Sequence, residues 1–170
     1  MINLIHLILG YLIIILFNGC ITNYLKWTIS NPRPDFMDRC GPVISYNMLV
    51  PFHIKKYCGN DINTFKFRDG LRSTPSGHST FISCSMSFIY EYLSTTTITN
   101  NNKAIRLSHL WCIVITLLVM YSRIVDHRHH WYDVVSGGII GWTIGRYGYI
   151  KILPNIHLLN IKRNSSTLPI

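Results

Sequence analysis

The chain opens with residues 1–24, MINLIHLILGYLIIILFNGCITNY, an almost continuous apolar run whose only acidic or basic side chain is His6. A helix of this length can cross about 30 Å of hydrocarbon. The run has no basic segment before it and no small-residue cleavage site after it, so it does not resemble a removable signal peptide. We therefore predict that this run forms a membrane-spanning helix.

Three further apolar segments, residues 79–98, 107–121 and 131–150, follow a long polar stretch over residues 25–77. Each segment is long enough to form a helix, and the polar residues between them suit connections outside the membrane. The sequence therefore predicts an all-α fold: a multi-pass membrane helical bundle with about four transmembrane helices and a long extramembrane loop.

The last apolar segment carries a glycine repeat. Gly137, Gly141 and Gly145 recur at every fourth position, a spacing of small residues that lets membrane helices pack closely. The sequence contains no internal repeat and no sign of a second domain. We expect residues 1–154 to form one membrane domain and residues 155–170 to form a short basic tail.

The composition agrees with a membrane protein. The 170 residues are 48% hydrophobic and only 14% charged, with a formal net charge of +9, whereas soluble domains are usually about 25% charged. Positive charge on a soluble protein would favour nucleic-acid binding. In a chain dominated by apolar runs, it is better explained by anionic lipid headgroups or a phosphate substrate. We therefore expect the bilayer and a lipid phosphate as partners, and no nucleic acid.

The five cysteines are scattered without the C-x-x-C spacing of a zinc site. Cys20, Cys84 and Cys112 lie within apolar runs, where they are expected to pack as small hydrophobic residues. Cys40 and Cys58 both lie in the long polar loop. They can form a disulfide if that loop faces an oxidising compartment, or they can be two free thiols.

Three polar motifs flank the apolar segments. Lys26 to Pro34 reads K-x6-R-P, Pro75 to His78 reads P-S-G-H, and Ser122 to Asp133 reads S-R-x5-H-x3-D. With four spans, the number of membrane crossings between any two motifs is even or zero. The topology therefore predicts that all three motifs emerge on the same face of the membrane.

The count of basic residues does not by itself decide the orientation, because the motif side carries ten Lys and Arg residues and the opposite side carries six. The six on the opposite side are Lys103, Arg106, Arg146, Lys151, Lys162 and Arg163. Lys and Arg are enriched in short cytoplasmic loops, so the short turn over residues 100–106 and the basic tail favour a cytosolic placement of that side. The basic residues on the motif side are partly accounted for by phosphate binding. We predict that the motifs lie on the lumenal or extracellular face.

The first and third motifs supply fixed positive charge through Lys26, Arg33 and Arg123. Phosphoryl transfer depends on charge positioned around the equatorial phosphate oxygens, and arginine can bind such oxygens in a bidentate manner. Any one of these residues alone could be a cation reaching the membrane interface. Together they predict a phosphate-binding site.

The second motif combines Ser76 and Gly77 at the start of an apolar segment. Serine can cap a helix, glycine lets the backbone approach a ligand, and the free N–H groups at a helix start can bind an anion. Taken alone, this motif is equally explained by helix capping. Next to three cations, it predicts further contacts to phosphate.

Two histidines and a carboxylate complete the predicted site. His129 and Asp133 are four residues apart, so at a helix start they share one face, where the carboxylate can hold one imidazole nitrogen and leave the other free to attack. His78 is then placed to protonate a leaving alkoxide. The rival interpretation is a metal site built from the neighbouring residues, namely Asp126, His127, His129, His130 and Asp133. Arg123 and Arg128 oppose cation binding there, so His127 and His130 are expected to lie at the surface or behind the site.

Together the motifs resemble the type 2 phosphatidic acid phosphatase family, the lipid phosphate phosphatases, over residues 1–150. Residues 33–40, 69–73 and 126–134 are similar to its eukaryotic branch. The resemblance implies that His129 forms a phosphohistidine, that Asp133 supports it and that His78 protonates the leaving group. It also implies that the phosphate is held by five residues, without metal or cofactor: Lys26, Arg33, Ser76, Gly77 and Arg123.

The resemblance further implies an integral membrane lipid phosphate phosphatase acting on phosphatidate, lysophosphatidate and diacylglycerol pyrophosphate. Two alternatives stay open: a transferase that passes the phosphorylated headgroup to an alcohol, and a non-catalytic lipid-binding membrane protein. Relatives of this branch resemble six-span proteins with two helices before the K-x6-R-P helix. We expect this chain to be a minimal form, a shortened one, or a homo-oligomer that covers the exposed surface. A smaller departure is Thr74, which stands where an aromatic residue commonly precedes P-S-G-H.

Overall fold

The computed structural model describes residues 4–41, 64–96 and 109–152, and every regular element within these ranges is a helix. The elements are α1 (Leu4–Ile29), α2 (Phe36–Cys40), α4 (Phe65–Gly70), α5 (Gly77–Thr96), α7 (Trp111–Val125) and α8 (Trp131–Ile152). The predicted all-α bundle is confirmed, and the four apolar segments correspond to α1, α5, α7 and α8.

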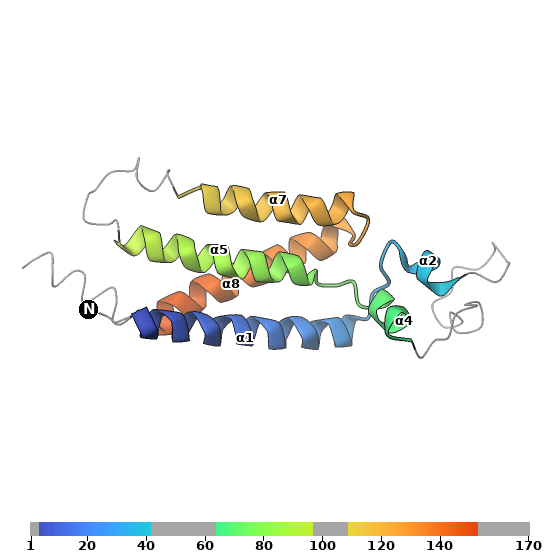
Figure 1. Cartoon of the computed structure of the whole chain (residues 1–170), viewed down its shortest axis with the longest axis horizontal. Helices are drawn as coiled ribbons and strands as arrows, with labels where there is room; N and C mark the ends of the chain where they lie inside the picture. The colour runs from blue at the N-terminus through green and yellow to red at the C-terminus, as the bar shows by residue number, and fades with distance from the viewer. Residues whose placement is uncertain (1–3, 42–63, 97–108, 153–170) are drawn as a thin grey trace, which may run out of the picture.

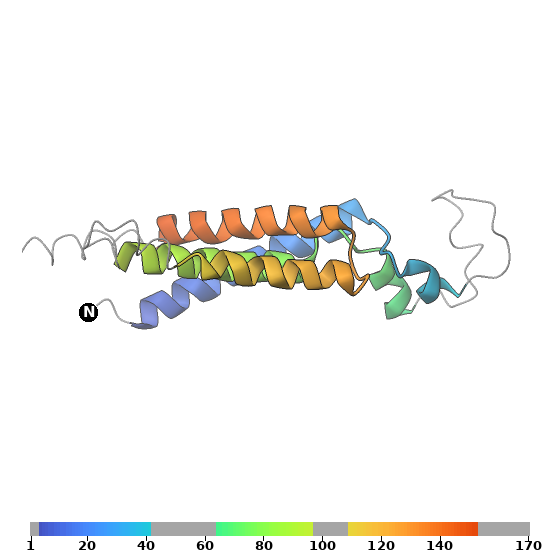
Figure 2. The same cartoon turned by 90° about the horizontal axis from the view of Figure 1, so that it is seen from above.

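The four long helices alternate in direction along an elongated bundle (Figures 1 and 2). As a result, the ends of α1 and α7 and the starts of α5 and α8 lie at the same end of the molecule, beside the short helices α2 and α4 (Figure 1). This arrangement agrees with the predicted convergence of the three motifs.

Helix α5 is the central element, since it packs against α1, α7 and α8. Its closest approach is to α8, through the glycine repeat. A Cβ atom built at Gly137, Gly141 and Gly145 would lie 2.7, 2.1 and 2.3 Å from the carbonyl oxygens of Ser76, Thr80 and Cys84, respectively. The fourfold glycine spacing therefore matches a fourfold spacing of carbonyl groups on α5, and the predicted role of the repeat in close helix packing is confirmed.

Helix α1 joins the bundle through a narrow stripe of buried residues, Gly10, Ile14, Asn18 and Thr22. Of these four residues, Ile14 packs with Phe88 and Tyr149 in the main apolar cluster. Most of the remaining leucine and isoleucine side chains of α1 are exposed. Among the described residues, α1 is the one helix long and apolar enough to cross a membrane; α7 is apolar but has only 15 residues.

Two helix ends extend beyond the predicted apolar segments. Helix α1 continues to Ile29 and α7 continues to Val125, so Lys26 and Arg123 lie on the last turns of helices. Cations are stabilised at such positions because they complement the negative end of the helix dipole. The longer helices bring both cations to the end of the bundle on rigid backbone.

The described part of the long loop forms a small layer over that end. Phe36 and Cys40 of α2 pack against Phe67 of α4, and the backbone N–H of Arg33 donates to the Gly70 carbonyl (2.8 Å). Cys40 is disulfide-bonded, which agrees with the first of the two alternatives, a disulfide rather than free thiols. Its predicted partner, Cys58, lies outside the described residues, as does the tail over residues 155–170.

Candidate active site

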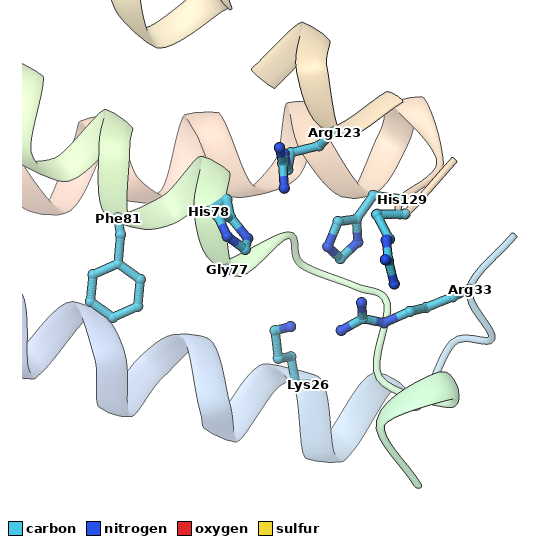
Figure 3. Close-up of a pocket in the computed structure, with 8 residues that line it drawn as sticks. Lys26, Arg33, Gly77, His78, Phe81, Arg123 and His129 are labelled. Carbon is cyan, nitrogen blue, oxygen red and sulfur yellow. The ribbon is translucent and has the colours of Figure 1, made fainter. Parts of the chain in front are cut away.

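A pocket of about 530 Å³ opens at the end of the bundle where the three motifs meet. Figure 3 shows side chains from α1, α5, α7 and the loop before α8 facing it. Eight residues line the pocket: Lys26, Arg33, Gly77, His78, Phe81, Arg123, Arg128 and His129. Six of the eight predicted site residues are therefore in its lining, and the remaining two, Ser76 and Asp133, are fully buried.

The two histidines approach the pocket from different helices. His78 lies in the first turn of α5, and His129 lies two residues before α8 begins. Their rings both face the space between Arg123 and Lys26 (Figure 3). Burial lowers the pKa of His78 below its usual 6.5, and the charges of Arg123 and His129 lower it further. The free site is thus strongly electropositive.

Asp133 is held by three donors. The hydroxyl groups of Ser73 and Thr74 donate to its two carboxylate oxygens, and the backbone N–H of His130 donates to Oδ2 at 2.9 Å. A buried carboxylate is costly unless it accepts such bonds. These three donors therefore stabilise Asp133 as a charged group beside His129.

The expected contact between His129 and Asp133 is longer than a hydrogen bond. The distance from His129 Nδ1 to Asp133 Oδ2 is 3.8 Å, outside the range of a hydrogen bond. The Ser73 hydroxyl lies between them, 3.2 Å from Nδ1. Ser73 was not predicted as a site residue, and Thr74 was noted only as a departure from the family. The available signal was two hydroxyl residues directly before P-S-G-H.

The predicted phosphate-binding cations have partners on the rim of the pocket. Arg33 Nη2 donates to Asp69 at 3.0 Å, Arg123 Nη2 to Asp126 at 2.9 Å, and Lys26 Nζ to the Arg72 carbonyl at 3.3 Å. Burial lowers the pKa of Arg33, against the effect of Asp69, but arginine keeps its charge in proteins.

Two acidic residues link Arg39 of α2 to two arginines of the pocket. Asp69 accepts from both Arg33 and Arg39, and Asp35 accepts from both Arg39 and Arg128. The chain of ion pairs fixes the loop that carries Arg33. It also reaches Arg128, a pocket residue that was expected only to oppose metal binding.

Ser76 differs from the expectation of a helix cap. Its hydroxyl has no hydrogen-bond partner among the described residues, while its backbone N–H donates to the Asp133 carbonyl at 2.9 Å. This backbone hydrogen bond between Ser76 and Asp133 can form because α8 approaches α5 closely at Gly137. The Nε atom of Arg33 is likewise buried without a partner. Buried donors usually find an acceptor, and the oxygens of a bound anion can serve both.

The fold and the pocket thus define a class of protein: a helical bundle with a cationic site that holds two imidazoles at one end. The chain belongs to the PAP2 superfamily, which it matches over residues 7–156. It is 41% identical to lipid phosphate phosphatase 1 of Saccharomyces cerevisiae over 87% of this chain and 56% of that protein. The family assignment made from the motifs is confirmed.

Other relatives carry related names. The chain is 33% identical to diacylglycerol pyrophosphate phosphatase 1 of Saccharomyces cerevisiae, over 79% of this chain and 47% of that protein. It is also 33% identical to lipid phosphate phosphatase 2 of Arabidopsis thaliana, over 88% of this chain and 51% of that protein. The chain therefore spans about half the length of these relatives. No solved structure matches it significantly.

Proposed function

We propose that this chain is an integral membrane lipid phosphate phosphatase, with residues 1–154 as its membrane domain. It hydrolyses phosphatidate, lysophosphatidate or diacylglycerol pyrophosphate through a phosphohistidine, without a metal. The observation that carries the proposal is the pocket, in which two imidazoles face a space whose four charged lining residues are all cations: Lys26, Arg33, Arg123 and Arg128. The printed names of the relatives support the lipid phosphate as substrate class.

In the proposed reaction, Lys26, Arg33 and Arg123 bind the phosphate oxygens, and the start of α5 at Ser76 and Gly77 adds donors. The free imidazole nitrogen of His129 attacks phosphorus. An N–P bond forms, the bond from phosphorus to the lipid oxygen breaks, and His78 gives that oxygen a proton. Water then attacks phosphorus, loses its proton to His78, and releases inorganic phosphate and free His129.

Several features support a site at the membrane surface on the lumenal or extracellular side. Trp27 and Trp131 are largely exposed at the pocket end of α1 and α8, and tryptophan is enriched at the level of the lipid headgroups. Cys40, in the adjacent layer, is disulfide-bonded, which is typical of proteins in oxidising compartments. The exposed apolar side chains of α1 can contact lipid or a second copy of the chain.

The proposal is tested by assaying the full chain, purified in detergent, against a panel of lipid phosphates in the presence of EDTA. We expect release of inorganic phosphate that vanadate inhibits, and no transfer of the headgroup when an acceptor alcohol is added. Formation of the headgroup ester of that alcohol would identify a transferase. Binding of lipid phosphates without any turnover would identify a lipid-binding protein.

The lowered pKa of His78 predicts a particular pH dependence. His78 acts as an acid only when protonated, so kcat/KM, which reports the free enzyme, should fall as the pH rises through a value below 6.5. A bound phosphate dianion adds negative charge beside the ring and raises its pKa. The corresponding fall in kcat should therefore occur at higher pH.

The measurement is a pair of profiles for kcat and kcat/KM, from about pH 4 to 9. The substrate phosphate itself titrates near pH ~6, so His78→Gln is the matched control. In His78→Gln, the fall in kcat/KM with rising pH that His78 causes should be absent, and any fall caused by the substrate phosphate should remain. Coincident profiles, or a kcat/KM that holds up well above pH 6.5, would contradict the assigned role of His78.

A further inference from the structure

The Ser73 hydroxyl occupies the centre of the contact between the imidazole and the carboxylate. Its oxygen is 3.2 Å from His129 Nδ1 and donates to Asp133 Oδ2 at 2.5 Å. The imidazole and carboxylate atoms are themselves 3.8 Å apart. All three side chains are buried, with exposed fractions of 0% for Ser73, 4% for His129 and 0% for Asp133. The path of short hydrogen bonds from His129 to Asp133 therefore runs through Ser73, and the direct contact between imidazole and carboxylate is the longer one, at 3.8 Å.

The number of protons decides the direction of both hydrogen bonds. A hydroxyl group has one proton, and an ionised carboxylate can only accept. The Ser73 proton therefore belongs to the bond to Asp133. The oxygen of Ser73 must then accept from His129, which requires the proton of the neutral imidazole to be on Nδ1. In that tautomer the lone pair is on Nε2, so Nε2 is the nucleophilic atom.

We infer that Ser73 is a positioning residue that selects the reactive tautomer of His129 and connects its ring to Asp133. The inference rests on the proposed phosphatase function. When the Nε2–P bond forms and the bond to the lipid oxygen breaks, the ring gains positive charge while Nδ1 keeps its proton. Ser73 accepts a hydrogen bond from Nδ1 and donates one to Asp133, and hydrogen bonds in such a chain polarise one another. The negative carboxylate thereby stabilises the positive charge on the His129 ring.

Thr74 provides a matched comparison within the same network. Its hydroxyl donates to Asp133 Oδ1 and accepts from Asn31 Nδ2 at 3.0 Å, and Asn31 also bonds to the Tyr132 hydroxyl at 3.1 Å. Thr74 thus holds the same carboxylate through its other oxygen. Of the two hydroxyl residues, Ser73 alone is also bonded to the His129 ring. Loss of either hydroxyl weakens the support of Asp133, but loss of Ser73 alone disconnects the imidazole.

The test compares Ser73→Ala with Thr74→Val in the full chain. In metal sites, residues that orient a ligating histidine typically contribute 10- to 100-fold. By analogy, we expect Ser73→Ala to lower kcat by about 100-fold. KM and the inhibition constant of inorganic phosphate should change by less than about threefold, because the phosphate ligands are intact. Thr74→Val should lower kcat by less than about tenfold. Equal losses in the two variants, or a Ser73→Ala enzyme with the wild-type kcat, would overturn the inference.

A spectroscopic measurement makes the test independent of catalysis. In ¹⁵N-histidine-labelled protein, NMR couplings identify which ring nitrogen carries the proton, and His129→Asn assigns the signal by its absence. We expect the Nδ1–H tautomer in the wild type and a shift towards Nε2–H in Ser73→Ala.

If the alanine variant does not fold, Ser73→Cys keeps the volume with a weaker hydrogen-bonding group and should shift the tautomer in the same direction. An unchanged tautomer would refute the role of Ser73 even if the proposed phosphatase activity holds; a wild type that is inactive on every lipid phosphate would refute that activity alone.

Discussion

Replacing His129 with alanine is expected to lower kcat for phosphate release by on the order of 10⁴-fold or more, because it removes the attacking atom. A loss of this size corresponds to about 5 kcal/mol of transition-state stabilisation. His129 is the imidazole in the pocket that is linked, through Ser73, to a buried carboxylate. His78 has no such link among the described contacts and lies at the start of α5. The two rings are therefore not interchangeable.

The measurement is the rate of phosphate release, combined with rapid-quench detection of acid-labile phosphate on the protein. The wild type should show a phosphoenzyme and His129→Ala should show none, while vanadate still binds to the remaining cations. His127→Asn is the matched control: His127 is an exposed neighbour with a positive φ of 51°, a conformation that asparagine tolerates well. Its activity should stay within about threefold of the wild type. A phosphoenzyme in His129→Ala would place the nucleophile elsewhere.

The sequence was sufficient for the parts of the fold that depend on periodicity and composition. Four apolar segments predicted four helices, and the even number of crossings predicted one shared face. The glycine spacing predicted close packing of the last helix, and the structure shows α5 as its partner, with Gly141 against Thr80. These features are properties of a helix considered alone or of simple topology. They can be read without knowing where any side chain points.

The remaining features depend on tertiary contacts that spacing does not encode. Ser73 lies 56 residues before His129 in the chain, and its part in the network appears only when the start of α5 is packed against α8. Arg128 was considered only as a cation that opposes metal binding, yet its side chain lines the same pocket. The motifs thus predicted the groups that we propose to react, whereas the structure was needed to find the hydroxyl group that contacts the proposed nucleophile.

Adding a single methyl group at Gly141 is expected to have the largest effect on the stability of the bundle. In Gly141→Ala, the new Cβ would lie 2.1 Å from the Thr80 carbonyl oxygen and 2.8 Å from its carbon. These are backbone atoms of a helix, so α5 must shift as a unit to relieve the clash. Alanine is favoured over glycine in a helix by about 1 kcal/mol, but overpacking of this kind costs about 1–3 kcal/mol or more. The net change should therefore be destabilising.

The same shift should also lower activity, because α5 carries His78 while α8 carries Asp133 and begins two residues after His129. The measurement is the thermal midpoint in detergent together with kcat. Val135→Ile is the matched control, since it also adds one carbon to α8 but at a side chain that is 43% exposed. We expect a fall of several degrees in the midpoint and a reduced kcat for Gly141→Ala, against no change for Val135→Ile. If Gly141→Ala were as stable as the wild type, the close contact between α5 and α8 would not hold the bundle together, and the alignment of the two imidazoles would need another source.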